Sequence, residues 1–330
     1  MKNIVIIGGG TGTFTLLAGL RKFPSNNSVI VSPADDGGST GVLRRELGVM
    51  PPGDIRQCLV GLSYTESEMR ELFSYRFASG SLKGHTVGNI IIAAFEKITG
   101  SSERAIALAA KMLNVRGEVI PAMIVSARLS ATLKNGSKII GEHAIDEPMR
   151  PRTSPIASLA LTPASRANPR AIAAIKKADA IVFGPGDLFT SILPNILARG
   201  MREAIVKSSA QKILVVNIMT KRGQTDDFRA SDFIATINTY LAGGKIKSVV
   251  DTAIVNMKKP NPKWLARYKK EGALFVEPNT SAIEAAGTTV ITGDFLSPIT
   301  AQKTAGDTLA RSFLRHDSDK TARAIWKLIS

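Results

Sequence analysis

The chain has very little cysteine and no long apolar run, and these absences exclude several classes of protein. Cys58 is the only cysteine in 330 residues, so the chain has no internal disulfide bond and no cysteine metal cluster. The longest apolar runs, such as residues 90–95, are far too short to cross a bilayer. The residues before Gly8 read as a buried strand and not as a signal peptide. We therefore expect a cytoplasmic protein without membrane insertion.

The charge is strongly one-sided, with 43 Lys and Arg against 27 Asp and Glu and a net charge of +16. Such a balance favours nucleic acid, anionic lipid or phosphate ligands as partners. The basic residues are scattered, however, and form no basic tail, zinc-finger spacing or RNA-recognition signature. Nucleic acid is therefore not the expected partner, whereas a phosphate ligand needs only a few of these charges.

The order of apolar runs and glycine turns predicts an α/β fold. Residues 4–7 form an apolar run typical of a central parallel strand, residues 13–23 have the spacing of a helix, and residues 28–32 form a second strand. Strand, glycine turn, helix and strand make a βαβ unit. The same rhythm returns with a helix at 169–177 and strands at 180–183, 213–216 and 249–255. A helix at 86–99 and a last helix at 320–329 complete the expectation.

The periodicity changes between residues 115 and 160. Residues 124–133 and 137–141 alternate like strands and flank Asn135 and Gly136, a pair that suits a type I′ hairpin turn. We interpret 115–160 as a small inserted subdomain that ends in the proline-rich stretch 148–155. The expected architecture is a Rossmann-like, mostly parallel sheet with helices on both faces, a small hairpin-containing insertion, and one domain over residues 1–330.

Four loops each follow a predicted buried strand. They are residues 8–12, 35–41, 184–191 and 217–220. In an open parallel sheet the carboxyl ends of the strands share one edge, where ligands bind. The four loops are therefore expected to converge on one site.

The first loop, from Gly8 to Gly12, has the glycines that let backbone N–H groups approach a phosphate. A dinucleotide fingerprint counted from Gly8 would need glycine at Thr13, and the lysine of a Walker motif is also missing. The loop thus predicts either a phosphate site outside those two motifs or a tight strand-to-helix turn without a ligand.

Two further loops carry acidic residues. Asp35 and Asp36 occupy the position where an acid binds a ribose hydroxyl in dinucleotide-binding folds. Together with Asp54 they are also candidates for Mg²⁺ ligands, or they simply form a turn. In the loop that starts at Gly184, helix capping by Thr190 and Ser191 would create a second anion site, although a carboxylate at Asp187 repels phosphate unless it points away.

Other polar residues have a functional and a structural interpretation. Arg44, Arg45 and Arg56 are possible phosphate partners, but each alone is more typical of a surface charge. His85 better fits a residue that organises a loop than a general base. Trp264 and Tyr268 stand four residues apart, so they either stack on a base or pack a helix.

Taken together, these motifs resemble the gluconeogenesis factor family over nearly the whole chain. The resemblance is carried by the sequence stretches 8–12, 34–41, 43–46, 51–59, 75–77, 84–89, 184–186, 217–220 and 315–317. The run from Asp35 to Leu59 is the most specific of them. The family shares its superfamily with 2-phospho-L-lactate transferase, so the resemblance implies a nucleotide-binding fold like that of the transferase.

The resemblance also implies a ligand and a role. Family members are linked to UDP-sugars such as UDP-N-acetylglucosamine and to normal cell shape on gluconeogenic carbon sources. Tyr268 and Arg315 match positions implicated in holding that ligand, so residues 258–330 are expected to complete the site. In the transferase, acids matching Asp36 and Asp54 hold a metal ion. The predicted ligand contacts are Gly9, Gly10, Thr11, Gly12, Thr13, Asp36, Gly37, Gly184, Pro185, Gly186, Thr190, Ser191, Asn217, Met219, Tyr268 and Arg315.

Alternatives stay open beside this interpretation. A Mg²⁺-dependent, nucleotide-linked transferase is the second hypothesis, and an NAD-dependent oxidoreductase is disfavoured by the broken glycine spacing. The oligomeric state is not fixed, so a homo-oligomer is one of the alternatives. No catalytic residue is assigned.

The sequence departs from the family pattern at one group of positions. This chain has Asp187 where the family usually has serine, and Phe189 where it usually has tyrosine. The usual Met-Thr-Gln-Pro-Gly-Glu-Thr reads Met-Thr-Lys-Arg-Gly-Gln-Thr, which places Lys221 and Arg222 where Gln and Pro are usual. These departures bear on the identity of the ligand more than on the fold.

Overall fold

The fold is built on one central sheet of seven parallel strands. The computed structural model describes residues 1–148, 152, 154–242, 248–299 and 313–330. The strand order is β10-β9-β8-β7-β1-β2-β3, and all neighbouring pairs run parallel. The strands are β1 (Lys2–Ile7), β2 (Ser25–Val31), β3 (Glu118–Pro121), β7 (Ala180–Phe183), β8 (Gln211–Val215), β9 (Thr252–Asn256) and β10 (Thr289–Gly293). This confirms the predicted Rossmann-like class.

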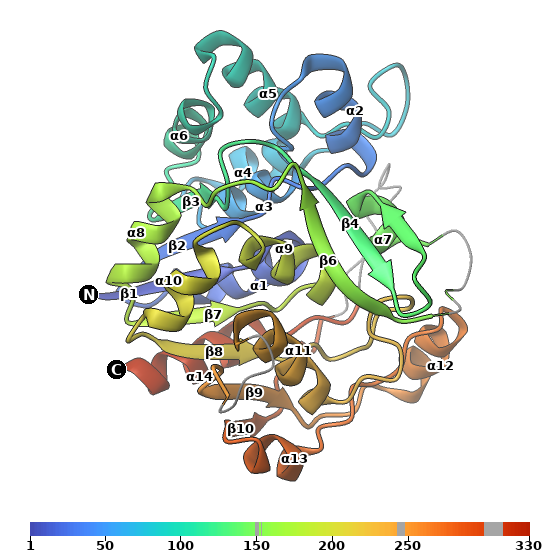
Figure 1. Cartoon of the computed structure of the whole chain (residues 1–330). Helices are drawn as coiled ribbons and strands as arrows, with labels where there is room; N and C mark the ends of the chain where they lie inside the picture. The colour runs from blue at the N-terminus through green and yellow to red at the C-terminus, as the bar shows by residue number, and fades with distance from the viewer. Residues whose placement is uncertain (149–151, 153, 243–247, 300–312) are drawn as a thin grey trace.

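Helices cover both faces of the sheet (Figure 1), and strand β1 shows why. Its side chains alternate, so Ile4 and Ile6 belong to one hydrophobic core while Val5 and Ile7 belong to the other. The first core contains residues of α1 (Gly10–Leu20), α3 (Gly53–Gly61), α4 (Ser67–Ser74), α5 (Val87–Thr99), α6 (Ser102–Met112) and α14 (Ser318–Ile329). The second contains residues of α8 (Pro169–Lys177), α9 (Leu193–Ile196), α10 (Met201–Lys207), α11 (Ala230–Ala242) and α13 (Thr280–Ala285).

A second, antiparallel sheet has the order β5-β4-β6. Its strands are β4 (Arg128–Leu133), β5 (Lys138–Ile140) and β6 (Ile156–Thr162), and α7 (Glu142–Asp146) follows β5 directly. Buried residues of β4 and β6 join the core on the α8–α11 side. Strand β3, although inside the range 115–160, belongs to the main sheet. Residues 149–151 and 153 of the proline-rich stretch lie outside the described residues.

Two local expectations are corrected here. Gly136 has a φ of +87°, but Asn135 has no positive φ, so the hairpin turn is not type I′. The Asn135 side chain instead accepts hydrogen bonds from the backbone and side chain of Ser137. Helix α1 begins at Gly10 and not at Thr13, so the glycines form its first turn.

The strands end on the side of the molecule where α7 and α12 (Pro262–Lys270) lie (Figure 1). The chain order reverses between β1 and β7, because β2 lies on one side of β1 and β7 on the other. Such a switch point leaves a crevice beyond the strand ends. No helix in the described ranges has both the length and the apolar character needed to cross a membrane.

The two loops at the switch point are in close contact, which explains one glycine. A Cβ added at Gly12 would lie 2.4 Å from the carbonyl oxygen of Pro185. We therefore expect Gly12→Ala to lower the free energy of unfolding by about 1–3 kcal/mol, the usual cost of overpacking, as measured by urea denaturation. Gly186→Ala is the matched control, because its Cβ would meet neighbours only at 3.5 Å. An equal loss of unfolding free energy in the two variants would show that the close approach of Gly12 to Pro185 is not the cause.

Candidate functional site

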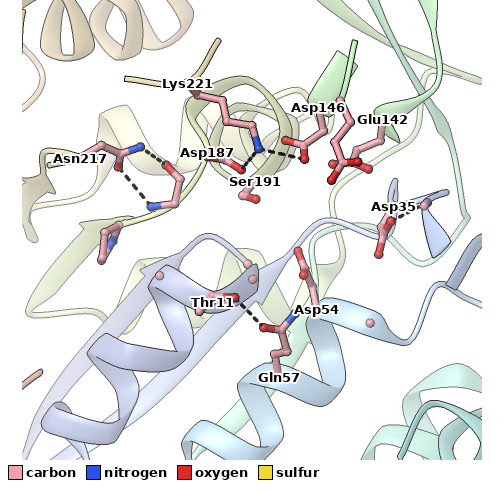
Figure 2. A pocket seen from close by; sticks show the side chains of 18 of the residues that line it. Thr11, Asp35, Asp54, Gln57, Glu142, Asp146, Asp187, Ser191, Asn217 and Lys221 are labelled. Carbon is pink, nitrogen blue, oxygen red and sulfur yellow. Dashed lines mark hydrogen bonds and ion pairs between the residues drawn. The ribbon is translucent and has the colours of Figure 1, made fainter. Parts of the chain in front are cut away.

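A cavity of about 500 Å³ opens at the carboxyl edge of the main sheet, within the usual size range of small-molecule sites. All four predicted loops contribute to its wall, and segments from α7, α12 and the C-terminal residues 314–316 complete it. Figure 2 shows the polar side chains that face this space. The convergence expected from the strand ends is therefore present.

Three helices begin at the cavity. Their first turns contribute Gly10 and Thr11 of α1, Ser39 and Thr40 of α2 (Gly38–Leu47), and Gly53 and Asp54 of α3. Helix N-termini expose backbone N–H groups and carry partial positive charge, so they favour anionic or hydroxyl ligands. This wall of the cavity is suited to bind oxygen atoms of a ligand.

Most of the residues predicted to contact a ligand lie on the cavity wall, and four do not. Those on the wall are Gly9, Gly10, Thr11, Gly12, Gly37, Pro185, Gly186, Ser191, Asn217, Met219, Tyr268 and Arg315, and Asp54, predicted as a metal ligand, is also there. Thr13, Asp36, Gly184 and Thr190 lie outside it. Thr13 is fully buried, and its hydroxyl donates a hydrogen bond to the Pro185 carbonyl at 3.4 Å.

The acid that faces the cavity is Asp35 and not Asp36. Asp36 accepts a hydrogen bond of 2.8 Å from the backbone N–H of His143 at the start of α7. Asp35 accepts one of 2.9 Å from the N–H of Gly37, and burial raises the pKa of its carboxyl group. Within the described residues, no group of three or more His, Cys, Asp or Glu side chains is placed to hold a metal ion. Asp36 therefore lies outside the cavity wall whereas Asp54 lies on it, and metal use stays a prediction.

The loop after β7 differs from the expected helix cap. The helical turn η1 (Leu188–Ile192) begins before Thr190, so neither Thr190 nor Ser191 caps it. Thr190 is buried, and its hydroxyl donates to Asp146 at 3.1 Å. Asn217, in the loop after β8, holds the loop after β7 in place. Its amide donates to the Gly186 carbonyl at 2.9 Å, and its amide oxygen accepts from the Gly186 N–H at 3.4 Å.

Lys221, Asp146 and Asp187 form an ion-pair cluster on the cavity wall, and the sequence did not predict that these residues meet. The ammonium group of Lys221 lies 3.1 Å from Asp146 and 3.3 Å from Asp187. Burial opposes charge on Lys221, but the two carboxylates outweigh it and raise its pKa. Burial also opposes ionisation of Asp146, yet Lys221 and the hydroxyl of Thr190 lower the pKa of Asp146. No sequence signal marked Asp146, because it belongs to the insertion and not to a loop after a main-sheet strand.

Glu142, at the start of α7, also faces the cavity close to these groups (Figure 2). Its pKa is raised well above the usual glutamate value, first by burial and then by the negative charges of Asp35 and Asp146. The cavity is therefore rich in carboxyl groups on the side formed by α7.

The two aromatic residues of α12 have different positions: Tyr268 is on the cavity wall and Trp264 is not. Tyr268 lines the cavity and is only 6% exposed, and its hydroxyl accepts hydrogen bonds from the backbone N–H groups of Phe313 and Leu314 at 2.9 and 3.1 Å. Trp264 is not on the cavity wall, and it stacks on Phe313 with ring centroids 5.7 Å apart. Trp264 therefore has the packing role that the spacing also allowed, and only Tyr268 is placed to meet a ligand in the cavity.

Of the arginine and histidine residues predicted as candidates, some lie on the cavity wall and others do not. Arg56 is buried, lines the cavity and donates to Asn89 at 2.9 Å, so the interpretation as a surface charge is wrong for this residue. Arg44 is outside the wall and donates to the carbonyl of Ala127. His85 is also outside the wall, and its Nδ1 lies 3.0 Å from the hydroxyl of Ser39 in α2. Arg76, which was not predicted as a site residue, is buried and lines the cavity.

A parallel sheet with a polar cavity at its switch point defines an α/β protein with a small-molecule site. The family model of 2-phospho-L-lactate transferase CofD matches residues 4–296. The gluconeogenesis factor of Halalkalibacterium halodurans is 39% identical over 326 residues, covering 98% of this chain and 95% of the relative. That of Bacillus subtilis is 37% identical over 328 residues, covering 99% and 98%. The chain therefore belongs to the gluconeogenesis factor family, within the larger family of 2-phospho-L-lactate transferase CofD.

Solved structures agree with this assignment. A crystal structure of a protein from Bacillus halodurans has a TM-score of 0.89 and 38% sequence identity, and the match covers 98% of each chain. A second crystal structure of a Bacillus halodurans protein has a TM-score of 0.88 at 38% identity and covers 98% of this chain and 99% of that one. The fold seen here is thus the fold of solved relatives over almost the whole chain.

His316 on the cavity wall gives a test by pH. It is buried, its Nε2 lies 3.1 Å from the Val216 carbonyl, and burial lowers its pKa to about 4 although that contact acts in the opposite direction. The unfolded chain takes up the proton near pH 6.5, so this contribution to stability is present above pH 6.5 and is lost as the pH falls towards 4. Between pH 7 and 4 we expect the free energy of unfolding of wild type to fall by about 3 kcal/mol more than that of His316→Gln. The reason is that a pKa difference of one between the folded and unfolded states is worth about 1.36 kcal/mol.

The measurement is urea unfolding across this pH range. His143→Gln is the control, because His143 is exposed, and it should follow wild type. A pH dependence of His316→Gln equal to that of wild type would show that His316 does not contribute.

Proposed function

We propose that the protein binds a nucleotide-linked sugar such as UDP-N-acetylglucosamine in this cavity. Through that ligand it acts as a cytoplasmic regulator of cell shape during growth on gluconeogenic carbon sources. The relatives named gluconeogenesis factor support the link to gluconeogenic growth in this proposal. Binding and regulation, rather than turnover, is the activity that we propose.

One observation carries the proposal. Tyr268 and Arg315, from the C-terminal part of the chain, lie on the same cavity wall as Gly9 to Gly12 at the start of α1. A ligand that touches both ends must be long and must combine an aromatic or apolar part with oxygen-rich groups. A base, a diphosphate and a sugar in series have this character, and helix N-termini suit the oxygen-rich part.

The second candidate is a transferase that moves a phosphate-bearing group from a nucleotide donor. It is favoured by the match to the transferase family model and by the carboxylates of Asp35 and Asp54 on the cavity wall. A divalent ion bound together with substrate phosphates would neutralise charge in such a reaction. The placement of Asp36 outside the wall weighs against the metal pair expected from the resemblance.

A thermal-shift panel with UDP-N-acetylglucosamine, GDP plus Mg²⁺, and NAD separates the candidates. A ligand at about 100 times its dissociation constant stabilises the folded state by roughly 2.7 kcal/mol. We expect UDP-N-acetylglucosamine to raise the midpoint and the other two to leave it nearly unchanged. A shift with GDP only in the presence of Mg²⁺, and none with the UDP-sugar, would reverse the order of the two candidates.

Tyr268→Ala tests the C-terminal wall. The substitution removes a buried ring and the acceptor of two backbone N–H groups, so it should also lower the midpoint of the free protein. Binding is therefore measured by isothermal titration at a temperature where the variant is folded, and we expect at least a tenfold loss of affinity. Lys269→Ala, at an exposed neighbouring position of α12, should bind like wild type. Unchanged affinity of Tyr268→Ala would remove Tyr268 from the site.

A further inference from the structure

The cluster of Lys221, Asp146 and Asp187 joins three separate segments at the cavity. Asp146 ends α7, Asp187 follows β7, and Lys221 follows β8. All three line the cavity, and both ion pairs are within 3.3 Å. The side chains are partly covered, at 20–35% exposure. A lysine held from two sides has a fixed position, which is what recognition of a ligand group needs.

Further hydrogen bonds hold this cluster in place. One oxygen of Asp146 accepts from the hydroxyl of Thr190 at 3.1 Å and from the amide of Gln224 at 2.9 Å, while its other oxygen faces Lys221. The backbone N–H of Lys221 donates to the hydroxyl of Thr225 at 2.8 Å. The ammonium group has three donors. Two of them face carboxylates in the described part of the chain, which leaves the third for a ligand.

The charge of the cluster decides which ligand group fits. One ammonium facing two carboxylates has no net positive charge, whichever carboxylate holds a proton. Glu142 lies beside Asp146 on the same side of the cavity (Figure 2). A phosphate here would meet the carboxyl groups of Asp146 and Asp187, with which the ammonium of Lys221 is already paired, and close like charges repel. Neutral hydroxyl groups can both donate to the carboxylates and accept from Lys221.

We propose that Lys221, with Asp146 and Asp187, forms the sugar subsite of the cavity and selects for uncharged, hydroxyl-bearing groups over phosphate. This inference rests on the proposed binding of a nucleotide-linked sugar. The first turns of α1 and α3, marked by Thr11 and Asp54, lie on the opposite side of the cavity from Lys221 (Figure 2). That opposite side also holds the carboxylates of Asp35 and Asp54, but three helices begin there, so we assign the diphosphate to their N-termini. The departures Asp187 and Lys221 therefore act together as one specificity element of this chain.

The test compares UDP with UDP-N-acetylglucosamine by isothermal titration on the full chain. In Lys221→Met we expect UDP-N-acetylglucosamine to bind at least tenfold more weakly, because the donor is lost and the carboxylates are left without their cation. UDP should bind within about threefold of wild type, because it does not reach the cluster. Lys221→Arg, which keeps the cation, should retain part of the preference for the sugar nucleotide. Lys263→Gln, an exposed lysine on α12, is the matched control for a general loss of positive charge.

Removal of the lysine alone leaves two carboxylates facing each other, which destabilises a protein strongly when they are buried. The double variant D187N/K221M avoids this and is measured in parallel. It should show the same loss of preference for the sugar nucleotide over UDP.

Three results would overturn the inference, and they are distinguishable. Equal losses for UDP and the sugar nucleotide would place Lys221 at the diphosphate. Unchanged affinities for both ligands, in Lys221→Met and in the double variant, would remove the cluster from the site. If wild type bound neither ligand, the proposed function itself would fail, and the subsite would fail with it.

Discussion

The structure depends on the contact between the ends of β1 and β7. The chain order reverses between these neighbouring strands, so the loops after them face each other across the crevice. Gly12 lets them approach, because any side chain there would meet the carbonyl oxygen of Pro185. Gly9 does the same for α3, because a Cβ there would lie 2.1 Å from a carboxylate oxygen of Asp54. Packing at the switch point therefore brings Pro185 and Asp54, which both line the cavity, close to the glycine loop.

This contact changes the meaning of the glycine motif. Alone, the run from Gly8 to Gly12 resembles an incomplete dinucleotide fingerprint. In the folded chain Gly12 is required by the backbone of Pro185, and Gly9 is crowded by the side chain of Asp54, with or without a ligand. Glycines that are explained by packing say little about which ligand binds, so the identity of the ligand must come from the polar side chains on the wall.

The main features of the fold were predictable because they follow from local patterns. Helix 169–177 and strand 180–183 match α8 and β7 to the residue, since each has a clear period and clear end signals. The short edge strand β10 was missed, because its residues 289–293 are only partly covered and lack a buried apolar run. Helix α1 was placed three residues late, because glycine has low helix propensity and only tertiary contacts hold it in the first turn.

The site was predictable only where it follows from topology. Loops after parallel strands must meet, and they do. Which of two adjacent aspartates faces the cavity depends on the local backbone direction, and here Asp35 is on the wall whereas the predicted Asp36 is not. Asp146 and Glu142 come from α7, which is brought to the site by the β4–β5 hairpin. Contacts of this kind join residues more than 70 positions apart, as between Asp146 and Lys221, and no local pattern signals them.

The residues that depart from the expected family pattern lie in two places, the hydrophobic core and the cavity wall. Phe189 is buried in the core and contacts Phe228 at 6.4 Å between ring centroids, so it is a packing change away from the cavity. Asp187 and Lys221 lie on the wall and pair with each other. A carboxylate introduced alone at this place would repel an anionic ligand and its neighbour Asp146. Paired with Lys221 it adds hydrogen-bonding groups without adding net charge, so the change makes this wall more selective while the wall formed by α1, α2 and α3 can keep its role.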